Sequence, residues 1–580
     1  MQPQVNKGLA PLLIIDLGAA AITAVIAFGW PMLGASVFAR LERRFAAVAS
    51  RNHLAVIAVG LSVVLLRIAI LPVYGIPSPF GPADFSFLLA ADTFAHGRLT
   101  NPTPAMWTHF ETIHITMVPT YQSMYFPGQG LLLAGSQVVF GHPWWGVLIS
   151  SALMCAALTW ALQAWLPANW ALLGGFIAVL RLGLFSYWTN TYHAGGSLSG
   201  LGGALVLGSL PRLKRTAQMR YGLLMGIGIA ILELTRPYEG LLLCLPVAAD
   251  LAFWAWKGDN RPPARMLLRR AALPLAVIVT AAAWLGYYDL EAFGEATTLP
   301  YTVDRAQYAV APYYVWQHPR PAPNYRHAML REFYQNAEMG SVRKIQSAQG
   351  FVRQTLLKPY LALMFYSGFM LLAPLLMLRR VLLDRRVRFL VVCVCVLAAG
   401  MAIEIFLLPH YVAPFVVAFY AIGLQAMRHL WLWKPEGRPV GRGLVRLMVA
   451  SCLLLAGLRL FAQPLHLAAS EWPPANWNQH WFGPEHYGIE RAQVEAHLES
   501  LPGPQLAVVR YGSGHEPQDE WVYNGANIDG SKVVWAREMD GQDNLDLVRY
   551  YKNRTVWLVE PDAVPVRVTP FPLDDSNKEK

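Results

Sequence analysis

Long apolar runs separated by short polar turns fill most of the first 463 residues. A helix needs about 20 apolar residues to cross roughly 30 Å of hydrocarbon. By that measure the pattern predicts twelve membrane-spanning helices, at 10–36, 53–74, 143–163, 168–187, 193–210, 217–234, 238–256, 270–290, 357–378, 387–408, 411–428 and 444–463. The apolar run at 129–141 would rise only about 20 Å as a helix, so we interpret it as an interfacial helix.

The end of the chain has a different pattern. Strand-like runs alternate with helical ones, which predicts a small α/β domain; the strands are expected at 506–511, 532–537 and 555–560 and the helices at 487–500 and 543–552. We therefore divide the chain into a transmembrane domain, 1–463, and a soluble external domain, 464–580. The transmembrane domain carries two large external loops, 75–142 and 291–356.

The composition agrees with a polytopic α-helical membrane protein, because 55% of the residues are hydrophobic and only 14% are charged. All five cysteines lie in apolar runs, which excludes a disulfide framework or a zinc site. The net charge of +11 arises largely from Lys and Arg in short loops, such as PRLKRTAQMR at 211–220. That distribution orients a membrane protein and excludes nucleic acid as a partner.

The same charges predict the topology. If 129–141 does not span, the Lys- and Arg-rich loops all fall on one side, which is then the cytoplasmic side. Both termini and both large loops are then expected outside the cytoplasm. We see no inverted repeat of the kind that marks many secondary transporters.

Polar residues gather on the predicted external side, where ionisable groups near a membrane are functional candidates. They are Asp84, Asp92, His96, Arg98, His109, Glu111 and His114 in the first loop, then Asn190, Tyr192 and His193, then Glu233, Arg236, Tyr238 and Glu239, and last His410 and Tyr411. We therefore expect an active site that faces outward at the membrane surface.

The stretch GPADFSFLLAADTFAHGRL, 81–99, follows the second predicted span. One apolar stripe runs through Phe87, Leu88, Ala91 and Phe94, which predicts a helix lying along the membrane surface. Asp84 stands near its start. It could cap the helix, or its carboxylate could take a proton from a sugar or other hydroxyl, and the two roles are compatible.

Other candidates also have two interpretations. His193 could cap the following helix, and Arg236 could either pair with Glu233 or Glu239 or clamp a phosphate. HFETIH, 109–114, contains metal-ligand residue types, but its spacing matches no strong metal motif. Asp92 and Glu111 compete with Asp84 as the base.

These segments together resemble the glycosyltransferase C superfamily, membrane enzymes that use polyprenyl-phosphate sugars, such as the aminoarabinose transferases of lipid A and the protein O-mannosyltransferases. ADFSFLLAADTFAHGRL matches the first external element, MYFPGQGLLLAGSQVVFG the second, and TNTYHAGG the segment that returns to the active site. The resemblance covers about 80–300.

The resemblance implies a glycosyltransferase that moves a hexose or pentose, with inversion, from a polyprenyl-phosphate donor to a hydroxyl of a glycan, lipid or protein acceptor. Asp84 would be the general base, Arg236 and Arg98 would hold the donor phosphate, and no cofactor is expected. Substrate-binding roles would fall to His96, Tyr125, Asn190, His193, Glu239 and His410. The aromatic loop 291–356 would wall the acceptor site or anchor the protein at the interface. The expected location is a bacterial inner membrane, with the active face and the C-terminal domain in the periplasm.

The chain departs from the family pattern at two places. Relatives commonly have an Asp-Glu pair where this chain has Ala83-Asp84, and often a Lys near the Pro segment where it has Met124, Tyr125 and Phe126. Two other functions therefore stay open: a catalytically silent subunit of envelope glycan assembly, and a transporter of lipid-linked glycans. A transferase requires Asp84, Arg236 and His193 at one cavity that opens both outward and to the lipid.

Overall fold

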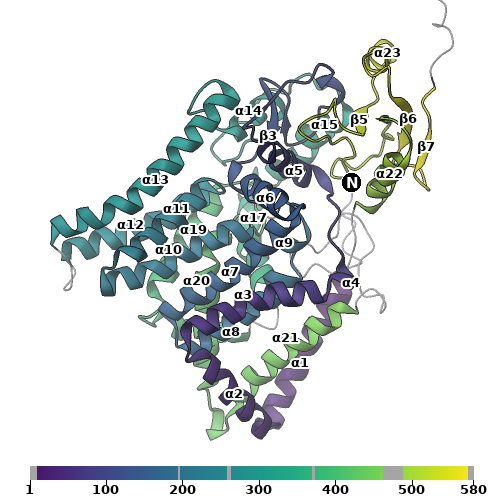
Figure 1. The fold of residues 1–580 in the computed structure, drawn as a ribbon. Coiled ribbons are helices and arrows are strands. Elements are labelled where there is room, and N and C mark those ends of the chain that lie inside the picture. Colours follow the sequence, from purple (N-terminus) through teal and green to yellow (C-terminus); the bar gives the residue numbers. More distant parts are fainter. Residues whose placement is uncertain (1–8, 194–195, 258–262, 369–372, 462–487, 573–580) are drawn as a thin grey trace, which may run out of the picture.

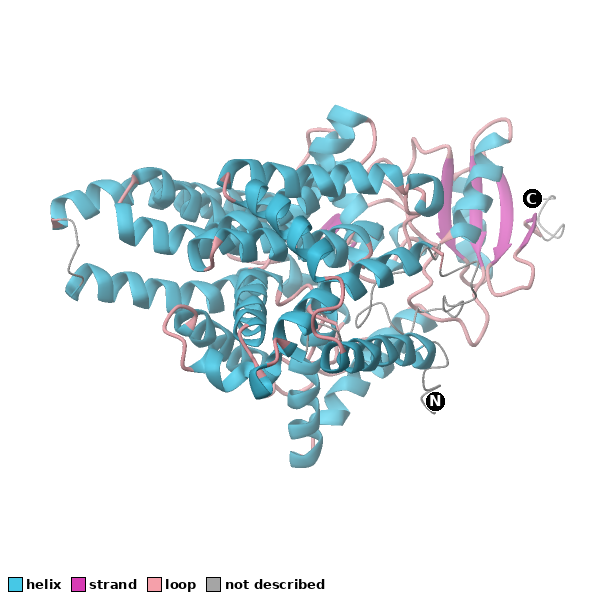
Figure 2. Ribbon diagram, turned by 90° about the horizontal axis from the view of Figure 1, so that it is seen from below, coloured by secondary structure: helices cyan, strands magenta, loops and turns pink. Residues whose placement is uncertain are grey.

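The computed structural model describes residues 9–193, 196–257, 263–368, 373–461 and 488–572. Figure 1 shows a body of packed helices with a smaller domain of strands and helices at one end, and Figure 2 shows the sheet of that domain from below. The prediction of a largely helical chain with a C-terminal α/β domain is therefore confirmed. The predicted boundary at 463/464 lies outside the described residues.

The helical body combines long and short helices. They are α1 (Leu9–Gly29), α2 (Ala35–Ala49), α3 (Asn52–Ala69), α4 (Leu71–Tyr74), α7 (Trp144–Trp165), α8 (Ala168–Ala178), α9 (Tyr187–Asn190), α10 (Gly196–Thr216), α11 (Met219–Glu233), α12 (Pro237–Lys257), α13 (Ala264–Phe293), α17 (Ala348–Tyr366), α18 (Leu378–Leu382), α19 (Arg388–Ile403), α20 (Val416–Trp431) and α21 (Val440–Leu460). α10 lies at the centre and packs against α7 and α11. A Cβ on Gly203 of α10 would lie 1.9 Å from the carbonyl oxygen of Pro414, so this close packing requires a glycine.

Within the described residues, five helices are long and apolar enough to cross a membrane: Asn52–Ala69, Trp144–Trp165, Pro237–Lys257, Arg265–Phe293 and Val440–Leu460. Three shorter apolar helices are Leu17–Gly29, Ala168–Leu184 and Arg388–Ile403. Each of the twelve predicted spans overlaps a helix of the structure, but the number of spans stays a prediction.

Two predicted spans differ most from the helices of the structure. The first ends at Gly29, and α2 fills most of the stretch between the first two predicted spans. The span at 357–378 is instead α17, which begins at Ala348 and ends at Tyr366. Gly368 adopts a left-handed conformation with φ +64° just after this helix, which is a common way for a helix to end.

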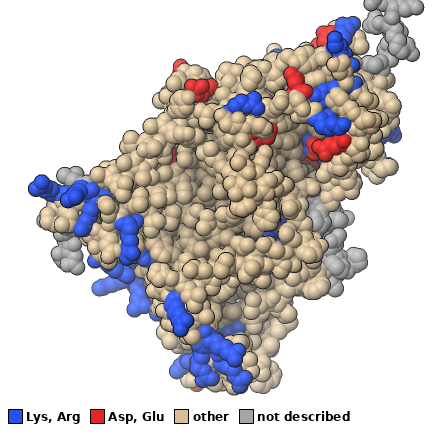
Figure 3. Space-filling model, in the orientation of Figure 1, with Lys and Arg blue, Asp and Glu red and all other residues tan. Residues whose placement is uncertain are grey.

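Lys and Arg side chains gather at the end of the helical body that lies away from the C-terminal domain, over α2 and the ends of α12 and α13 (Figure 3). Asp and Glu appear mainly on the upper part of the same face. This separation along the molecule agrees with the charge asymmetry from which the topology was predicted.

The first loop that we predict to be external, 75–142, contains α5 (Gly81–Ala95), three short strands and α6 (Pro127–Phe140). β3 (Thr120–Ser123) pairs antiparallel with both β1 (Asn101–Pro102) and β2 (Ile115–Thr116). α6 has 14 residues and rises about 21 Å, too little to cross a bilayer. Its length agrees with the interfacial interpretation.

α5 begins at the predicted position but does not lie on a surface. Phe87 and Ala91 of the predicted apolar stripe belong to the main core of the helical body. Phe85 and Leu89, which lie outside that stripe, are also buried, because the C-terminal domain covers their face of the helix. The prediction of a one-sided surface helix is therefore wrong, and α5 is a buried helix between two layers.

The second external loop forms α14 (Pro300–Tyr308), α15 (Ala328–Arg331) and α16 (Glu338–Ile345). Tyr308, Leu330 and Tyr334 of this loop share a small core with Ile113 of the first loop. The two loops predicted to be external therefore pack together as one structure.

The C-terminal domain has a four-stranded sheet of order β5-β4-β6-β7. Its elements are α22 (Ile489–Ser500), β4 (Gln505–Val509), β5 (Val533–Arg537), α23 (Gly541–Tyr550), β6 (Thr555–Glu560) and β7 (Arg567–Pro570). β4 pairs parallel with β5 and β6, and β7 pairs antiparallel with β6. The five predicted elements are confirmed with small shifts in their bounds, and β7 is additional.

This domain is bound to the first loop by polar and aromatic contacts. Phe85 stacks on Tyr523 with ring centres 4.6 Å apart, and Asp92 Oδ2 accepts a hydrogen bond of 2.7 Å from the Ala526 N–H. The buried carboxylate of Glu520 accepts from Thr112 Oγ1 at 2.6 Å and from Arg537 Nη2 at 2.8 Å. These contacts hold the domain against α5.

Candidate functional site

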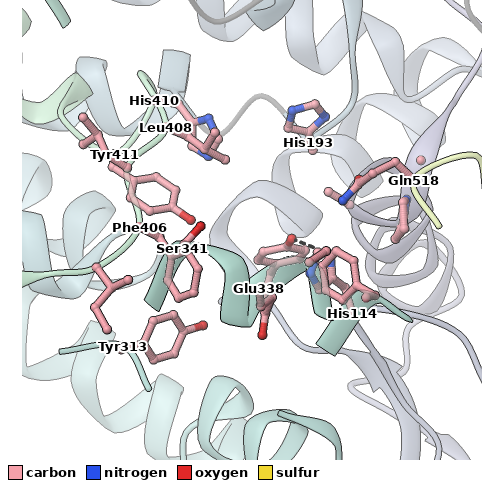
Figure 4. Close-up of a pocket in the computed structure, with 18 of the residues that line it drawn as sticks. His114, His193, Tyr313, Glu338, Ser341, Phe406, Leu408, His410, Tyr411 and Gln518 are labelled. Atoms are coloured by element: carbon pink, nitrogen blue, oxygen red, sulfur yellow. Dashed lines mark hydrogen bonds between the residues drawn. The ribbon is translucent and has the colours of Figure 1, made fainter. Parts of the chain in front are cut away.

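A cavity of about 560 Å³ lies where the external loops meet the helical body. Its walls come from the start of α5, the 114–125 segment, the 187–193 segment, the second external loop, α17 and the 405–411 segment. Figure 4 shows His193 and His410 at the top of the view, Tyr411 and Phe406 on one side, and His114 and Gln518 on the other. Segments that are far apart in the sequence therefore meet at one site.

Asp84 lies in the first turn of α5 behind the wall of this cavity, and its side chain is fully buried. Its Oδ1 accepts hydrogen bonds from the Tyr192 N–H (2.9 Å), the His193 N–H (2.7 Å) and His193 Nδ1 (2.7 Å). Its Oδ2 accepts from the Phe80 N–H at 3.3 Å. Of the two interpretations of Asp84, the N-cap is wrong, because the N-cap of α5 is Phe80. Asp84 instead accepts a bond from the N–H of that N-cap residue.

His193 is the member of this pair that lines the cavity. Its ring stacks on the Tyr187 ring with centres 5.7 Å apart, and the Tyr187 hydroxyl lies 2.8 Å from His410 Nδ1. Because a carboxylate oxygen only accepts, the contact with Asp84 places a proton on His193 Nδ1. This arrangement orients an imidazole toward the cavity.

The cavity has a cationic side. The Arg236 guanidinium lies 4.3 Å from the centre of the Tyr411 ring, and Arg236 Nη1 lies 3.9 Å from Glu239 Oε1. Lys358 of α17 donates from Nζ to the carbonyl oxygens of Met401 and Glu404. Both cations line the cavity, so an anion bound there would meet two positioned positive charges.

Further ionic groups line the wall formed by the second loop. Arg305 Nη1 pairs with Glu338 Oε1 at 2.7 Å, and burial raises the pKa of Glu338 even beside this partner. Burial and the charge of Arg236 hold the pKa of His410 well below its usual value. Burial likewise lowers the pKa of His114 to about 3. These two imidazoles are therefore neutral, and arginine and lysine supply the positive charge.

Tyrosines cover much of the remaining wall. Tyr125, Tyr301 and Tyr313 line it together with Tyr411, and the Tyr125 hydroxyl lies 3.0 Å from His114 Nδ1. His114 has φ +65°, an uncommon conformation for a residue with a side chain. Of the two roles considered for the aromatic loop 291–356, wall of a site or interfacial anchor, the positions of Tyr301 and Tyr313 favour the first.

An apolar groove of about 410 Å³ adjoins the cavity, between α17, α19 and α20. Lys358 and Leu407 line both spaces, so the groove meets the cavity at a cation. The rest of the groove is formed mainly by aliphatic and aromatic side chains, such as Leu363, Leu397 and Phe419. A molecule with a charged head and a long apolar chain fits this arrangement.

Several predicted site residues lie elsewhere. Arg98 and His96 follow the C-terminal end of α5, whereas the cavity is at its N-terminal end, about 20 Å away along a helix of 15 residues. The His96 side chain is 58% exposed. Asn190 Oδ1 accepts from the buried Arg67 Nη2 at 2.9 Å, and Glu239 lies behind Arg236. Of the residues predicted to bind substrate or phosphate, Arg236, Tyr125, His193 and His410 line the cavity, and so do the further candidates His114 and Tyr411.

The HFETIH segment does not converge on one point. His109 Nδ1 contacts the carbonyl oxygen of Arg537 at 2.9 Å, Glu111 Oε1 accepts from Tyr308 and Arg326, and His114 contacts Tyr125. Over the described parts of the chain, no group of three His, Cys, Asp or Glu side chains is placed to hold a metal ion. The segment therefore serves the packing of the external loops and one wall of the cavity.

Sequence reasoning missed Lys358, Arg305 and Gln518, which all line the cavity. Lys358 had a readable signal, since a lysine at the edge of an apolar run is uncommon. Arg305 is one basic residue in a tyrosine-rich stretch, and Gln518 lies in the C-terminal domain. Only the folded arrangement assigns those two to the site.

Comparisons with known proteins give structural neighbours only. No protein-family model matches the sequence, and no curated protein matches it. ArnT from Cupriavidus metallidurans in the apo state is 12% identical, with 86% of this chain and 92% of that chain covered and a TM-score of 0.49. The same protein bound to undecaprenyl phosphate gives a TM-score of 0.47.

The Archaeoglobus fulgidus oligosaccharyltransferase, in a complex with Zn and sulfate, is 12% identical, with 87% of this chain and 67% of that chain covered and a TM-score of 0.44. Both neighbours belong to the glycosyltransferase C superfamily, the family named by the sequence resemblance. At these scores and identities the likeness supports no statement about the reaction, which has to be argued from the site itself.

The hydrogen bonds to Asp84 predict a difference between two substitutions. Asp84→Ala leaves the buried N–H groups of Tyr192 and His193 without their acceptor, which costs about 2–5 kcal/mol of folding free energy. Asp84→Asn keeps an oxygen for them and costs about 1 kcal/mol. Thermal unfolding of the purified protein in detergent measures both. Equal melting temperatures for the two variants would contradict this structural role.

Proposed function

We propose that this protein is a membrane glycosyltransferase that moves a sugar from a polyprenyl-phosphate donor to an acceptor hydroxyl at the external face of the membrane, with inversion. One observation carries the proposal: a cavity with Arg236 and Lys358 on one side and the Asp84–His193 pair behind another continues into an apolar groove at Lys358. A lipid-linked anionic donor needs that combination of a cationic pocket and an adjoining apolar groove.

The donor would bind with its phosphate between Arg236 and Lys358 and its isoprenoid chain in the groove between α17, α19 and α20. Arginine suits phosphate because its planar guanidinium presents several donors at once. Phosphate is also the leaving group, so the cations would stabilise the charge that develops on its oxygen in the transition state. Arg98 is not part of this proposal, since it lies at the far end of α5.

The sugar would lie against the tyrosine-rich wall, near Tyr125 and His410. Aromatic faces suit the apolar faces of sugar rings, and hydroxyl and neutral imidazole groups can hydrogen-bond the sugar hydroxyls. Asn190 and Glu239 would position other residues and would not contact the sugar. Asn190 hydrogen-bonds Arg67, and Glu239 pairs with Arg236.

The Asp84–His193 pair would serve as the general base. The acceptor oxygen forms a bond to the anomeric carbon, the bond from that carbon to the phosphate oxygen breaks, and the acceptor proton passes to the pair. His193 is the member that faces the acceptor, and the buried carboxylate of Asp84 orients the ring and stabilises its charged form. A single acidic residue is sufficient for this step.

The test is sugar transfer by proteoliposomes that contain the full chain and a panel of polyprenyl-phosphate sugars. We expect transfer by the wild type and at least a hundredfold loss in Asp84→Asn, since a general base typically contributes that much. Asp92→Asn is the matched control, because it makes the same change on the same helix away from the cavity. Transfer that survives in Asp84→Asn would contradict the base, and a folded wild type that transfers none of the sugars would favour the silent-subunit alternative.

The cationic side makes a separate prediction about the donor. Removing one charge-assisted phosphate contact costs about 1.5–3 kcal/mol, so the donor KM should rise about tenfold to a hundredfold in Lys358→Met and in Arg236→Gln/Glu239→Gln. The double substitution avoids leaving Glu239 buried without its partner.

Arg98→Gln is the control for that experiment, because it removes an external arginine that does not line the cavity. Its donor KM should equal that of the wild type. A rise in Arg98→Gln as large as in the other variants would show that the phosphate binds elsewhere.

A further inference from the structure

One loop of the C-terminal domain reaches the catalytic cavity. Gln518 lies in the segment between β4 and β5 and lines the cavity together with Gly81, Pro82 and His193 (Figure 4). Its carbonyl oxygen would lie 3.2 Å from a Cβ placed on Gly81, which has φ +74°. The loop therefore packs directly against the turn of α5 that carries Asp84.

The loop is held in place from within the domain. Glu520, two residues after Gln518, is almost fully buried. Its Oε1 accepts from the Tyr511 hydroxyl at 2.6 Å and the Val522 N–H at 2.8 Å, and its Oε2 accepts from Thr112 and Arg537. Burial alone would raise the pKa of Glu520, but Arg537 and these hydrogen bonds lower it. The ionised carboxylate thus anchors the loop that presents Gln518.

The position of Gln518 in the cavity indicates whether it contacts the donor or the acceptor. Figure 4 shows Gln518 to the right of His193 and above His114, on the side of the cavity away from Tyr411. The Arg236 guanidinium lies over Tyr411, so the donor phosphate belongs to that opposite side. In an inverting displacement the attacking hydroxyl and the leaving phosphate lie on opposite sides of the anomeric carbon. Gln518 therefore faces the acceptor.

We infer that Gln518 is a specificity-determining residue through which the C-terminal domain selects a neutral, polyhydroxylated acceptor. The inference rests on the proposed function. A glutamine side chain carries a donor and an acceptor but no charge. Gln518 hydrogen-bonds an acceptor hydroxyl that is next to the attacking hydroxyl. This contact lies near the Asp84–His193 pair and away from Arg236 and Lys358. The acceptor class is thus a glycan hydroxyl, and the C-terminal domain completes the active site.

The test compares acceptors as well as variants. The probes are a set of methyl hexopyranosides and their monodeoxy analogues, supplied with the donor that the wild type uses. In the wild type, removal of the hydroxyl that Gln518 binds should raise the acceptor KM about threefold to tenfold. In Gln518→Ala the acceptor KM of the parent glycoside should rise by the same factor. The parent glycoside and the deoxy analogue should then have equal acceptor KM values.

Gln542→Ala is the matched control, because Gln542 lies on α23 of the same domain and bonds only its neighbour Asp546 among the described contacts. The donor KM and the melting temperature should stay at wild-type values in both variants, which a merely structural role of Gln518 would not allow. A wild type that transfers, with an unchanged acceptor KM in Gln518→Ala, overturns this inference and leaves the proposed function standing. Absence of transfer by the wild type overturns both.

Discussion

The fully buried carboxylate of Asp84 is the interaction on which the rest of the site depends. A buried carboxylate is stable only when donors replace its water, and here three backbone N–H groups and one imidazole do so. The bond to Tyr192 joins residues 108 positions apart in the chain. α5 is in turn held by the C-terminal domain through Tyr523 and Ala526. The Asp84 carboxylate therefore joins α5 to the 192–193 segment of the helical body, and Phe85 and Asp92 of the same helix join it to the C-terminal domain.

Charge is separated within the cavity, and this separation gives it a direction. Lys358 lies where the cavity and the apolar groove meet, and Arg236 lines the cavity. His114 and His410 are neutral because they are buried. In the proposed reaction, a donor with a phosphate and a long chain would enter in one orientation only. The acceptor would then bind beside the Asp84–His193 pair and Gln518, on the side away from the cations.

Local patterns predicted the fold where local physics decides it. The strand-like runs predicted near the end of the chain correspond to β4, β5 and β6, and the helical stripe within 81–95 corresponds to α5. Burial on the second face of α5 was not predictable, because Phe85 and Leu89 are covered by a domain more than 400 residues away. The bounds of α17 were also misread, since Gly368 rather than hydropathy ends that helix.

The candidate site was predicted in part for the same reason. Asp84, His193 and Arg236 became candidates because ionisable groups at membrane boundaries are uncommon. The same rule also selected Arg98, which lies at the end of α5 that is far from the cavity. Lys358 and Gln518 depend on how α17 and the C-terminal loop pack, which no short-range pattern encodes.

Cryo-electron microscopy of the full chain in lipid nanodiscs with undecaprenyl phosphate would locate the bound lipid. We expect phosphate density between Arg236 and Lys358 and isoprenoid density along α17, α19 and α20. Density for the lipid at another surface, with the cavity and groove empty, would contradict this expectation.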